Sequence, residues 1–151
     1  MAATQRIEVV EECGAPAASI WALLEDTDNW SVWGPWRESE LEREGSPPPS
    51  GVGAIRRLRV GRRVLREETT VFEPDREMAY RILSGIPVRN YEGRVRLDQV
   101  GSTATITWSS SFVGSFPGVG PLVRRSLEPK VAEIARRLAR AAEVTSEPVD
   151  E

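Results

Sequence analysis

Apolar and polar residues alternate with a period of two through the middle of the chain. Short turn sequences rich in glycine, proline and serine separate five such runs: Ala54–Val60, Arg63–Phe72, Glu77–Leu83, Arg89–Val100 and Thr103–Val113. Alternation of this kind is typical of half-buried strands, and separators of hairpin length join antiparallel neighbours. The pattern therefore predicts an antiparallel meander. Two further strands are expected over Gln5–Glu12 and, in a more polar stretch, over Arg37–Arg43.

Helical spacing appears on both sides of this meander. Pro16 suits the first turn of a helix that follows the first strand, and the segment from Trp30 to Trp36 predicts a short helix and a turn. Near the C-terminus the apolar residues recur every three or four positions, which predicts a long helix with one apolar stripe: Val123, Leu127, Val131, Ile134 and Leu138. Pro129 lies inside this stretch, so we expect it to kink the helix or split it near Leu127.

The order of elements, together with several local sequences, resembles the polyketide cyclase/dehydrase-like branch of the START/Bet v 1-like (SRPBCC) superfamily. The segments that carry the resemblance are Ala15–Leu24 with Asn29-Trp30, Glu67–Arg76, Met78–Ile82, Pro87–Gly93, Gly101–Trp108 and Pro117–Leu122. The resemblance implies an α+β helix-grip fold, in which a curved seven-stranded antiparallel sheet wraps around a long C-terminal helix. Two short helices are expected between strands 1 and 2. One such domain would span residues 1–144, followed by a flexible acidic tail over 145–151.

The resemblance also implies an apolar cavity between the sheet and the last helix, in which relatives hold lipids, sterols, hormones or polyketides. Strand alternation predicts which side chains face it, although a slip of one residue would reverse a strand's two faces. On Arg63–Phe72 two sets remain open. Glu68, Thr70 and Phe72 face inward if Phe72 does, and otherwise the inward set is Glu67, Thr69 and Val71.

With the first of these sets, the candidate cavity residues are Trp30, Trp33, Trp36, Arg56, Leu58, Glu68, Thr70, Phe72, Tyr80, Tyr91, Val95, Trp108, Ser110, Phe112, Leu127 and Val131. Arg56 and Glu68 thereby become candidate buried charges on neighbouring strands, placed to hold a polar head group. Charged residues are rarely fully buried unless they are paired, so a position on the convex face or the rim is the commoner outcome. Trp108, in the middle of a strand, is the best single candidate for a cavity wall.

The amino-acid composition limits the catalytic and metal-binding groups that the chain can offer. The 151 residues include no histidine and only one cysteine, which excludes serine–histidine and cysteine–histidine nucleophiles, histidine-ligated zinc and internal disulfides. We therefore expect no metal and no cofactor. The net charge of −3 disfavours nucleic acid as a partner. Neither a membrane span nor the apolar stretch of a signal peptide is visible, so we expect a cytoplasmic protein without integral membrane association, either a monomer or a homodimer.

The first functional hypothesis is binding of a small hydrophobic or amphipathic ligand, lipid- or polyketide-like, between the sheet and the last helix. The alternative is a cyclase or aromatase, whose acid–base groups would be limited to Tyr80, Tyr91, Glu68 and Arg56. A third possibility is a vestigial cavity filled by the chain's own tryptophans. Polar groups converging in the cavity would favour an enzyme, and walls made only of apolar atoms would exclude one.

Overall fold

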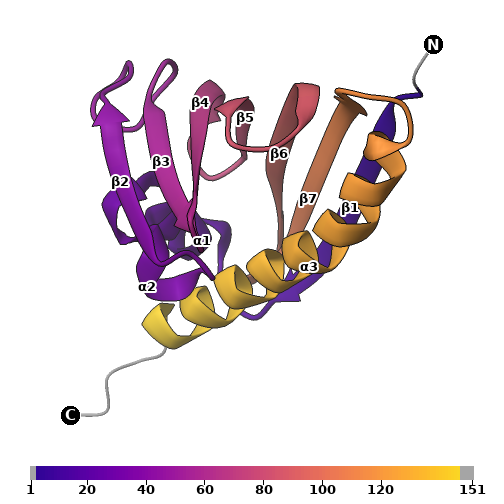
Figure 1. The fold of residues 1–151 in the computed structure, drawn as a ribbon. Helices are drawn as coiled ribbons and strands as arrows, with labels where there is room; N and C mark the ends of the chain where they lie inside the picture. Colours follow the sequence, from indigo (N-terminus) through magenta and orange to yellow (C-terminus); the bar gives the residue numbers. More distant parts are fainter. Residues whose placement is uncertain (1–2, 147–151) are drawn as a thin grey trace.

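The computed structural model describes residues 3–146 and shows one curved antiparallel sheet with a long helix across its concave side (Figure 1). The strands lie in the order β1-β7-β6-β5-β4-β3-β2, so the first strand closes the sheet against the last. Their bounds are β1 Gln5–Cys13, β2 Glu38–Arg43, β3 Ile55–Val60, β4 Arg63–Glu73, β5 Glu77–Ser84, β6 Val88–Val100 and β7 Thr103–Gly114. The predicted meander and the helix-grip fold are confirmed.

Three short helical segments connect β1 to β2: α1 (Ala17–Glu25), the 3-10 turn η1 (Thr27–Asn29) and α2 (Trp30–Trp33). The amphipathic face of α1 buries Ile20, Trp21 and Leu24 against the sheet. Burial of side chains of this size stabilises the fold by about 1.5–3 kcal/mol for each aliphatic residue. The expected short helices between the first two strands are therefore present, and they cover one end of the sheet.

Alternation holds closely on β6 and β7. Tyr91, Gly93, Val95 and Leu97 are buried on β6, whereas Glu92, Arg94 and Arg96 between them are exposed. On β7 the buried members are Ala104, Ile106, Trp108, Ser110 and Phe112. Because side chains of a strand point alternately to its two faces, these residues form the inner surface that the C-terminal helix covers.

The C-terminal helix α3 (Val119–Ser146) runs without a break through Pro129, so the predicted split near Leu127 is wrong. Pro129 removes one backbone donor, and the carbonyl that it would have satisfied belongs to Arg125. Both residues are exposed, so water can hydrate that carbonyl. The helix packs chiefly on β1, β7 and α1 and buries Val131, Ala135, Leu138, Ala139 and Ala142.

The helix continues through Thr145 and Ser146, which we expected to belong to the tail. The rest of the predicted tail, residues 147–151, lies outside the described residues. Within residues 3–146, no helix is long and apolar enough to cross a membrane.

Candidate functional site

A cavity of about 340 Å³ lies between the inner face of the sheet, the Trp30–Trp36 segment and α3. Its walls are mostly apolar, and its volume falls at the lower end of the roughly 300–1,000 Å³ usual for small-molecule sites. The lining residues are Trp30, Pro35, Trp36, Val60, Arg63, Leu65, Glu67, Tyr80, Ile82, Gly85, Ile86, Tyr91, Trp108, Leu127, Lys130, Val131, Glu133 and Ile134.

The cavity has a buried inner end and an exposed mouth. Trp30, Glu67, Tyr80, Tyr91 and Trp108 are each at most 5% exposed, which places them at the inner end. The mouth is marked by lining residues that solvent reaches freely, namely Val60, Arg63 and Lys130. A ligand in the cavity would therefore meet polar atoms at both ends and apolar walls between them.

Several of the predicted cavity residues do line it: Trp30, Trp36, Tyr80, Tyr91, Trp108, Leu127 and Val131. Others face inward but lie behind the wall, where packing covers them completely or nearly so: Arg56, Leu58, Val95, Ser110 and Phe112. The inward orientation predicted for β3, β5, β6 and β7 is thus correct. The two groups differ in how deeply their side chains are packed behind the cavity wall. Alternation predicts which way a side chain points but not how deeply it is packed.

The inward placement of Glu68 and Thr70 is wrong. Glu68 lies on the convex face, where it forms ion pairs with Arg43 at 2.8 Å and with Arg81. Thr70 is exposed on the same face. The cause is a β-bulge, because Thr69 pairs with Tyr80 and Val71 with the adjacent Ala79, which leaves Thr70 as an extra residue.

The bulge reverses the alternation within β4. Glu67 and Thr69 point inward before it, and Phe72 reaches the core after it, so each of the two predicted sets is correct for only part of the strand. Phe72 does not line the cavity. It packs on Trp21 of α1, with 5.0 Å between the ring centroids.

Trp33 also lies away from the cavity. It lines a separate open groove on the outer side of the molecule, between the α1–α2 region and α3, together with Leu23, Arg136 and Arg140. We call this the outer groove. Trp33 still supports the site, because its ring contacts Trp30 and Trp36 with centroids 5.6 and 5.4 Å away. The three indoles therefore form one packed cluster, of which Trp30 and Trp36 face the cavity.

Arg56 and Glu67 form a buried ion pair at the inner end. Arg56 donates from Nε and Nη2 to Oε1 of Glu67 at 3.3 and 3.1 Å, and from Nη1 to the hydroxyl of Thr69 at 2.8 Å. The guanidinium also lies between the rings of Trp30 and Tyr80, 4.6 and 5.3 Å from their centroids. Arg56 thus holds Glu67 in place without touching the cavity itself.

Two phenols complete the inner end. The indole N–H of Trp108 donates to the hydroxyl of Tyr80 at 3.1 Å, and the hydroxyl of Tyr91 donates to Ser110 at 2.7 Å. The hydroxyl of Tyr80 lies within hydrogen-bonding reach of Tyr91, and Oε2 of Glu67 has no donor among the described residues. Both side chains line the cavity, so a ligand there can bind the Glu67 carboxylate and compete with Tyr91 for the Tyr80 proton. We call Glu67, Tyr80 and Tyr91 the inner polar cluster.

Burial sets the protonation of this cluster. It raises the pKa of the Glu67 carboxyl above its ordinary 4.5, and the Arg56 guanidinium offsets only part of that effect. It also holds the pKa of Tyr80 well above 10 and raises that of Tyr91 to about 12. Both phenols therefore keep their protons at neutral pH and act as hydrogen-bond donors, while Glu67 exchanges its proton closer to neutrality than an exposed glutamate does.

Sequence reasoning missed most of the mouth, including Arg63, Leu65 and Lys130, and it left Glu67 open as a member of the alternative inward set. Leu65 shares its strand face with Glu67, so alternation identifies it once the bulge is known. No group of three or more histidine, cysteine, aspartate or glutamate residues suited to a metal occurs within residues 3–146.

Comparison with known proteins gives one family match. The family model described as polyketide cyclase / dehydrase and lipid transport matches residues 4–143. No curated protein matches the chain.

Solved structures resemble the chain in fold. The protein XoxI from Bacillus cereus has a TM-score of 0.77 at 18% identity, covering 98% of this chain and 100% of its own. The Zhui aromatase/cyclase from Streptomyces sp. R1128 has a TM-score of 0.73 at 20% identity, and the match covers 95% of this chain and 93% of that protein. A START superfamily protein from Mycobacterium smegmatis has a TM-score of 0.72 at 16% identity, and the match covers 93% of this chain and 95% of that protein.

Proposed function

The chain belongs to the polyketide cyclase / dehydrase and lipid transport family, and on that premise we propose that it binds a small amphipathic molecule in the cavity between the sheet and α3. The observation that carries this proposal is the cavity itself: about 340 Å³ remains open although three tryptophans, Trp30, Trp36 and Trp108, line it. A vestigial cavity would be filled by its own side chains. Apolar walls with a few placed polar groups are the usual character of a ligand site.

The inner polar cluster supports a definite orientation for such a ligand. The Tyr80 hydroxyl offers a donor and Oε2 of Glu67 offers an acceptor, within walls formed by Trp30 and Trp108. A hydroxyl group at the buried end of the ligand satisfies both atoms, because it accepts from Tyr80 and donates to Glu67, whereas a carbonyl group satisfies Tyr80 alone. Leaving buried polar atoms without partners costs about 1–3 kcal/mol each, so a purely aliphatic ligand would bind less tightly than one with a polar end.

Binding is tested with N-phenyl-1-naphthylamine, a neutral apolar dye that fluoresces when it leaves water. The substitution Ile134→Trp places a larger side chain in the cavity wall, and Val144→Trp makes the same change in the outer groove. We expect the wild type and Val144→Trp to bind the dye with similar affinity. Ile134→Trp should bind it with an affinity at least tenfold lower. Equal binding by all three proteins, or no binding by the wild type, would contradict the proposal.

A second function is favoured by one observation: Glu67, Tyr80 and Tyr91 converge at the buried end of the cavity. There the Glu67 carboxylate can remove a proton from carbon next to a carbonyl group, and the Tyr80 hydroxyl can donate a hydrogen bond to the resulting enolate oxygen. One of the structural neighbours is an aromatase/cyclase, and proton removal of this kind is a step in ring closure of a polyketide-like chain.

The enzymatic alternative is tested by hydrogen–deuterium exchange at C2 of 1-phenyl-1,3-butanedione, followed by NMR. We expect the wild type to accelerate exchange and Glu67→Gln to abolish the acceleration. Tyr80→Phe should reduce it by about 10²-fold or more, the usual contribution of a positioned acid–base group. Exchange at the uncatalysed rate in the presence of a protein that binds the dye would leave ligand binding as the function.

A further inference from the structure

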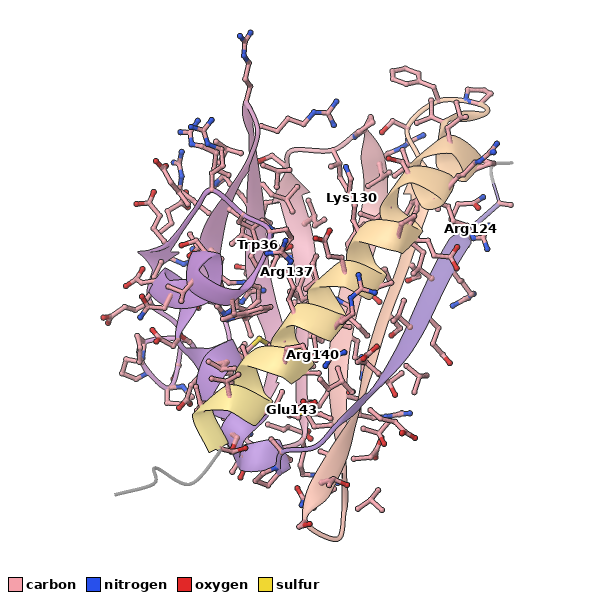
Figure 2. The ribbon with its side chains drawn as sticks, turned by 90° about the horizontal axis from the view of Figure 1, so that it is seen from below. Trp36, Arg124, Lys130, Arg137, Arg140 and Glu143 are labelled. Carbon is pink, nitrogen blue, oxygen red and sulfur yellow. The ribbon has the colours of Figure 1, made fainter. Side chains whose placement is uncertain are left out.

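Two cations from different walls line the mouth of the cavity. Arg63 comes from the start of β4, next to the turn that joins it to β3, and Lys130 comes from α3. Both are exposed and both line the cavity. Figure 2 shows Lys130 on the flank of α3 that faces the middle strands and Arg124 on the opposite flank. There Arg124 donates a hydrogen bond to the backbone carbonyl of Arg6 in β1.

These two cations have no carboxylate within ion-pairing distance among the described residues. The only acidic residue that lines the mouth is Glu133, and Arg137 holds it in an ion pair at 2.9 Å. On the convex face the arginines of β3 and β4 behave differently, since Arg57, Arg59 and Arg66 are each paired with a glutamate of β2. The mouth therefore keeps a positive charge that the protein itself does not neutralise.

The inner end carries no unpaired cation, because Arg56 is paired with Glu67. Glu67 lines the cavity there and has one carboxylate oxygen without a hydrogen bond among the described residues, so an anionic group would meet repulsion at that end. A ligand with one charged end and one neutral polar end can therefore bind well in only one direction, with its anion outward.

We infer that the ligand is an amphipathic organic acid whose carboxylate lies at the mouth between Arg63 and Lys130. This inference rests on the proposed ligand-binding function and adds the chemical class of the ligand. The planar guanidinium of Arg63 suits a carboxylate in two-point contact, and the flexible ammonium of Lys130 adds a second point charge. The apolar body of the acid then fills the space between the mouth and the inner polar cluster.

A matched pair of dyes tests the charge preference. 1-Anilinonaphthalene-8-sulfonate and N-phenyl-1-naphthylamine share one aromatic skeleton and differ by the anionic group. We expect Arg63→Gln and Lys130→Gln each to weaken binding of the anionic dye about fivefold, which corresponds to the roughly 1 kcal/mol of a partly exposed ion pair. The loss for the neutral dye should be clearly smaller than the loss for the anionic dye, because the neutral dye has no charge for either cation to attract. Arg124→Gln is the matched control on the other flank of α3 and should affect neither dye.

Competition against the neutral dye tests the carboxylate itself. Decanoate should displace the dye at a concentration at least tenfold lower than 1-decanol, and this advantage should shrink in Arg63→Gln and in high salt.

The chain contains a single lysine, so reductive methylation with ¹³C-formaldehyde labels Lys130 as its only side-chain amine while keeping the charge. Addition of decanoate should shift the Lys130 dimethylamine resonance in the wild type. The same addition to Ile134→Trp, whose cavity is narrowed, should leave it unmoved.

The outcomes separate this inference from the function on which it rests. If the neutral dye binds in the cavity but neither mouth substitution affects the anionic dye, and decanoate competes no better than decanol, the ligand class is wrong and the binding function stands. If neither dye binds the wild type, both the ligand-binding function and the ligand class are wrong. Equal loss of both dyes in Arg63→Gln would also overturn the inference, because it would show a general effect on the cavity.

Discussion

The guanidinium of Arg56 donates two hydrogen bonds to one carboxylate oxygen of Glu67, at 3.3 and 3.1 Å, and the other oxygen of this cavity-lining residue has no hydrogen bond among the described residues. Arg56 is fully buried, and Glu67 is 5% exposed. Burial of two charges is costly, and their attraction offsets this cost only when the geometry is good and the remaining donors are satisfied. Here Thr69 and the rings of Trp30 and Tyr80 supply the additional contacts of Arg56.

This pair predicts an asymmetric response to substitution. Arg56→Met leaves Glu67 buried without a partner and should lower the free energy of unfolding by about 3–5 kcal/mol. The double variant Arg56→Met/Glu67→Leu removes both charges and should recover most of that loss. Urea denaturation measures both. Arg81→Gln, which breaks an exposed ion pair on the convex face, is the control and should cost less than about 1 kcal/mol. A double variant no more stable than Arg56→Met would contradict this account.

Stability should depend on pH through Glu67. Its pKa in the folded protein is raised above 4.5, so the folded state binds the Glu67 proton more tightly than the unfolded state. The resulting stabilisation is fully present below pH 4.5 and is lost as the pH rises through the raised pKa. The stability of the wild type minus that of Glu67→Gln should therefore fall with increasing pH across this window. A difference that rises with pH would show that Arg56, and not burial, dominates the pKa.

The two tyrosines give an optical test of the inner polar cluster. They are the only phenols of the chain, and burial raises the pKa of both. Absorbance at 295 nm should show little tyrosinate in the folded protein at pH 10–11, and Tyr91 should be half ionised near pH 12 unless the protein unfolds first. In 8 M urea both tyrosines should titrate near pH 10. Ionisation of either tyrosine near pH 10 in the folded protein would place its hydroxyl in water.

Gly93 predicts how closely the inner wall is packed. It pairs with Tyr80 across β5 and β6, and a Cβ at this position would overlap the Tyr80 phenol ring. Gly93→Ala should therefore push Tyr80 into the cavity, lower stability by about 1–3 kcal/mol and weaken dye binding. The control is Gly14→Ala, where the added methyl group would sit 3.7 Å from Glu143 in ordinary contact. A neutral effect of Gly93→Ala on both stability and dye binding would refute this packing.

Much of the fold was predictable because alternation and turn chemistry are local properties. The inward positions of Tyr80 and Trp108 follow from period two, and both side chains are buried. Period two also places Arg56 inward, and its pairing with Glu67 explains why this charge is buried and does not lie at the rim. The β4 strand shows where this reasoning fails. A single extra residue, Thr70, reverses the alternation, and neither composition nor spacing marks it as a bulge. Alternation therefore cannot decide between Glu68 and its neighbour Glu67, and the bulge makes each inward set correct for only part of β4.

The cavity was less predictable than the fold. Arg56, Val95 and Phe112 face the same way as residues that line the cavity, yet packing covers them. Whether a side chain reaches the open space depends on the fit of its neighbours to within an ångström, which no sequence period describes. Trp33 illustrates the same point, since three indoles within seven residues do not reveal which ring faces which side.

The most direct test of the central claim uses the five tryptophan indole N–H resonances in a ¹⁵N NMR spectrum. Trp30, Trp36 and Trp108 line the cavity, whereas Trp21 of α1 packs on Phe72 and Trp33 lines the outer groove. Single Trp→Phe variants assign the signals. Titration with N-phenyl-1-naphthylamine should shift the signals of Trp30, Trp36 and Trp108 and leave those of Trp21 and Trp33 in place. Shifts confined to Trp33, or no shift at all, would contradict a ligand site between the sheet and α3.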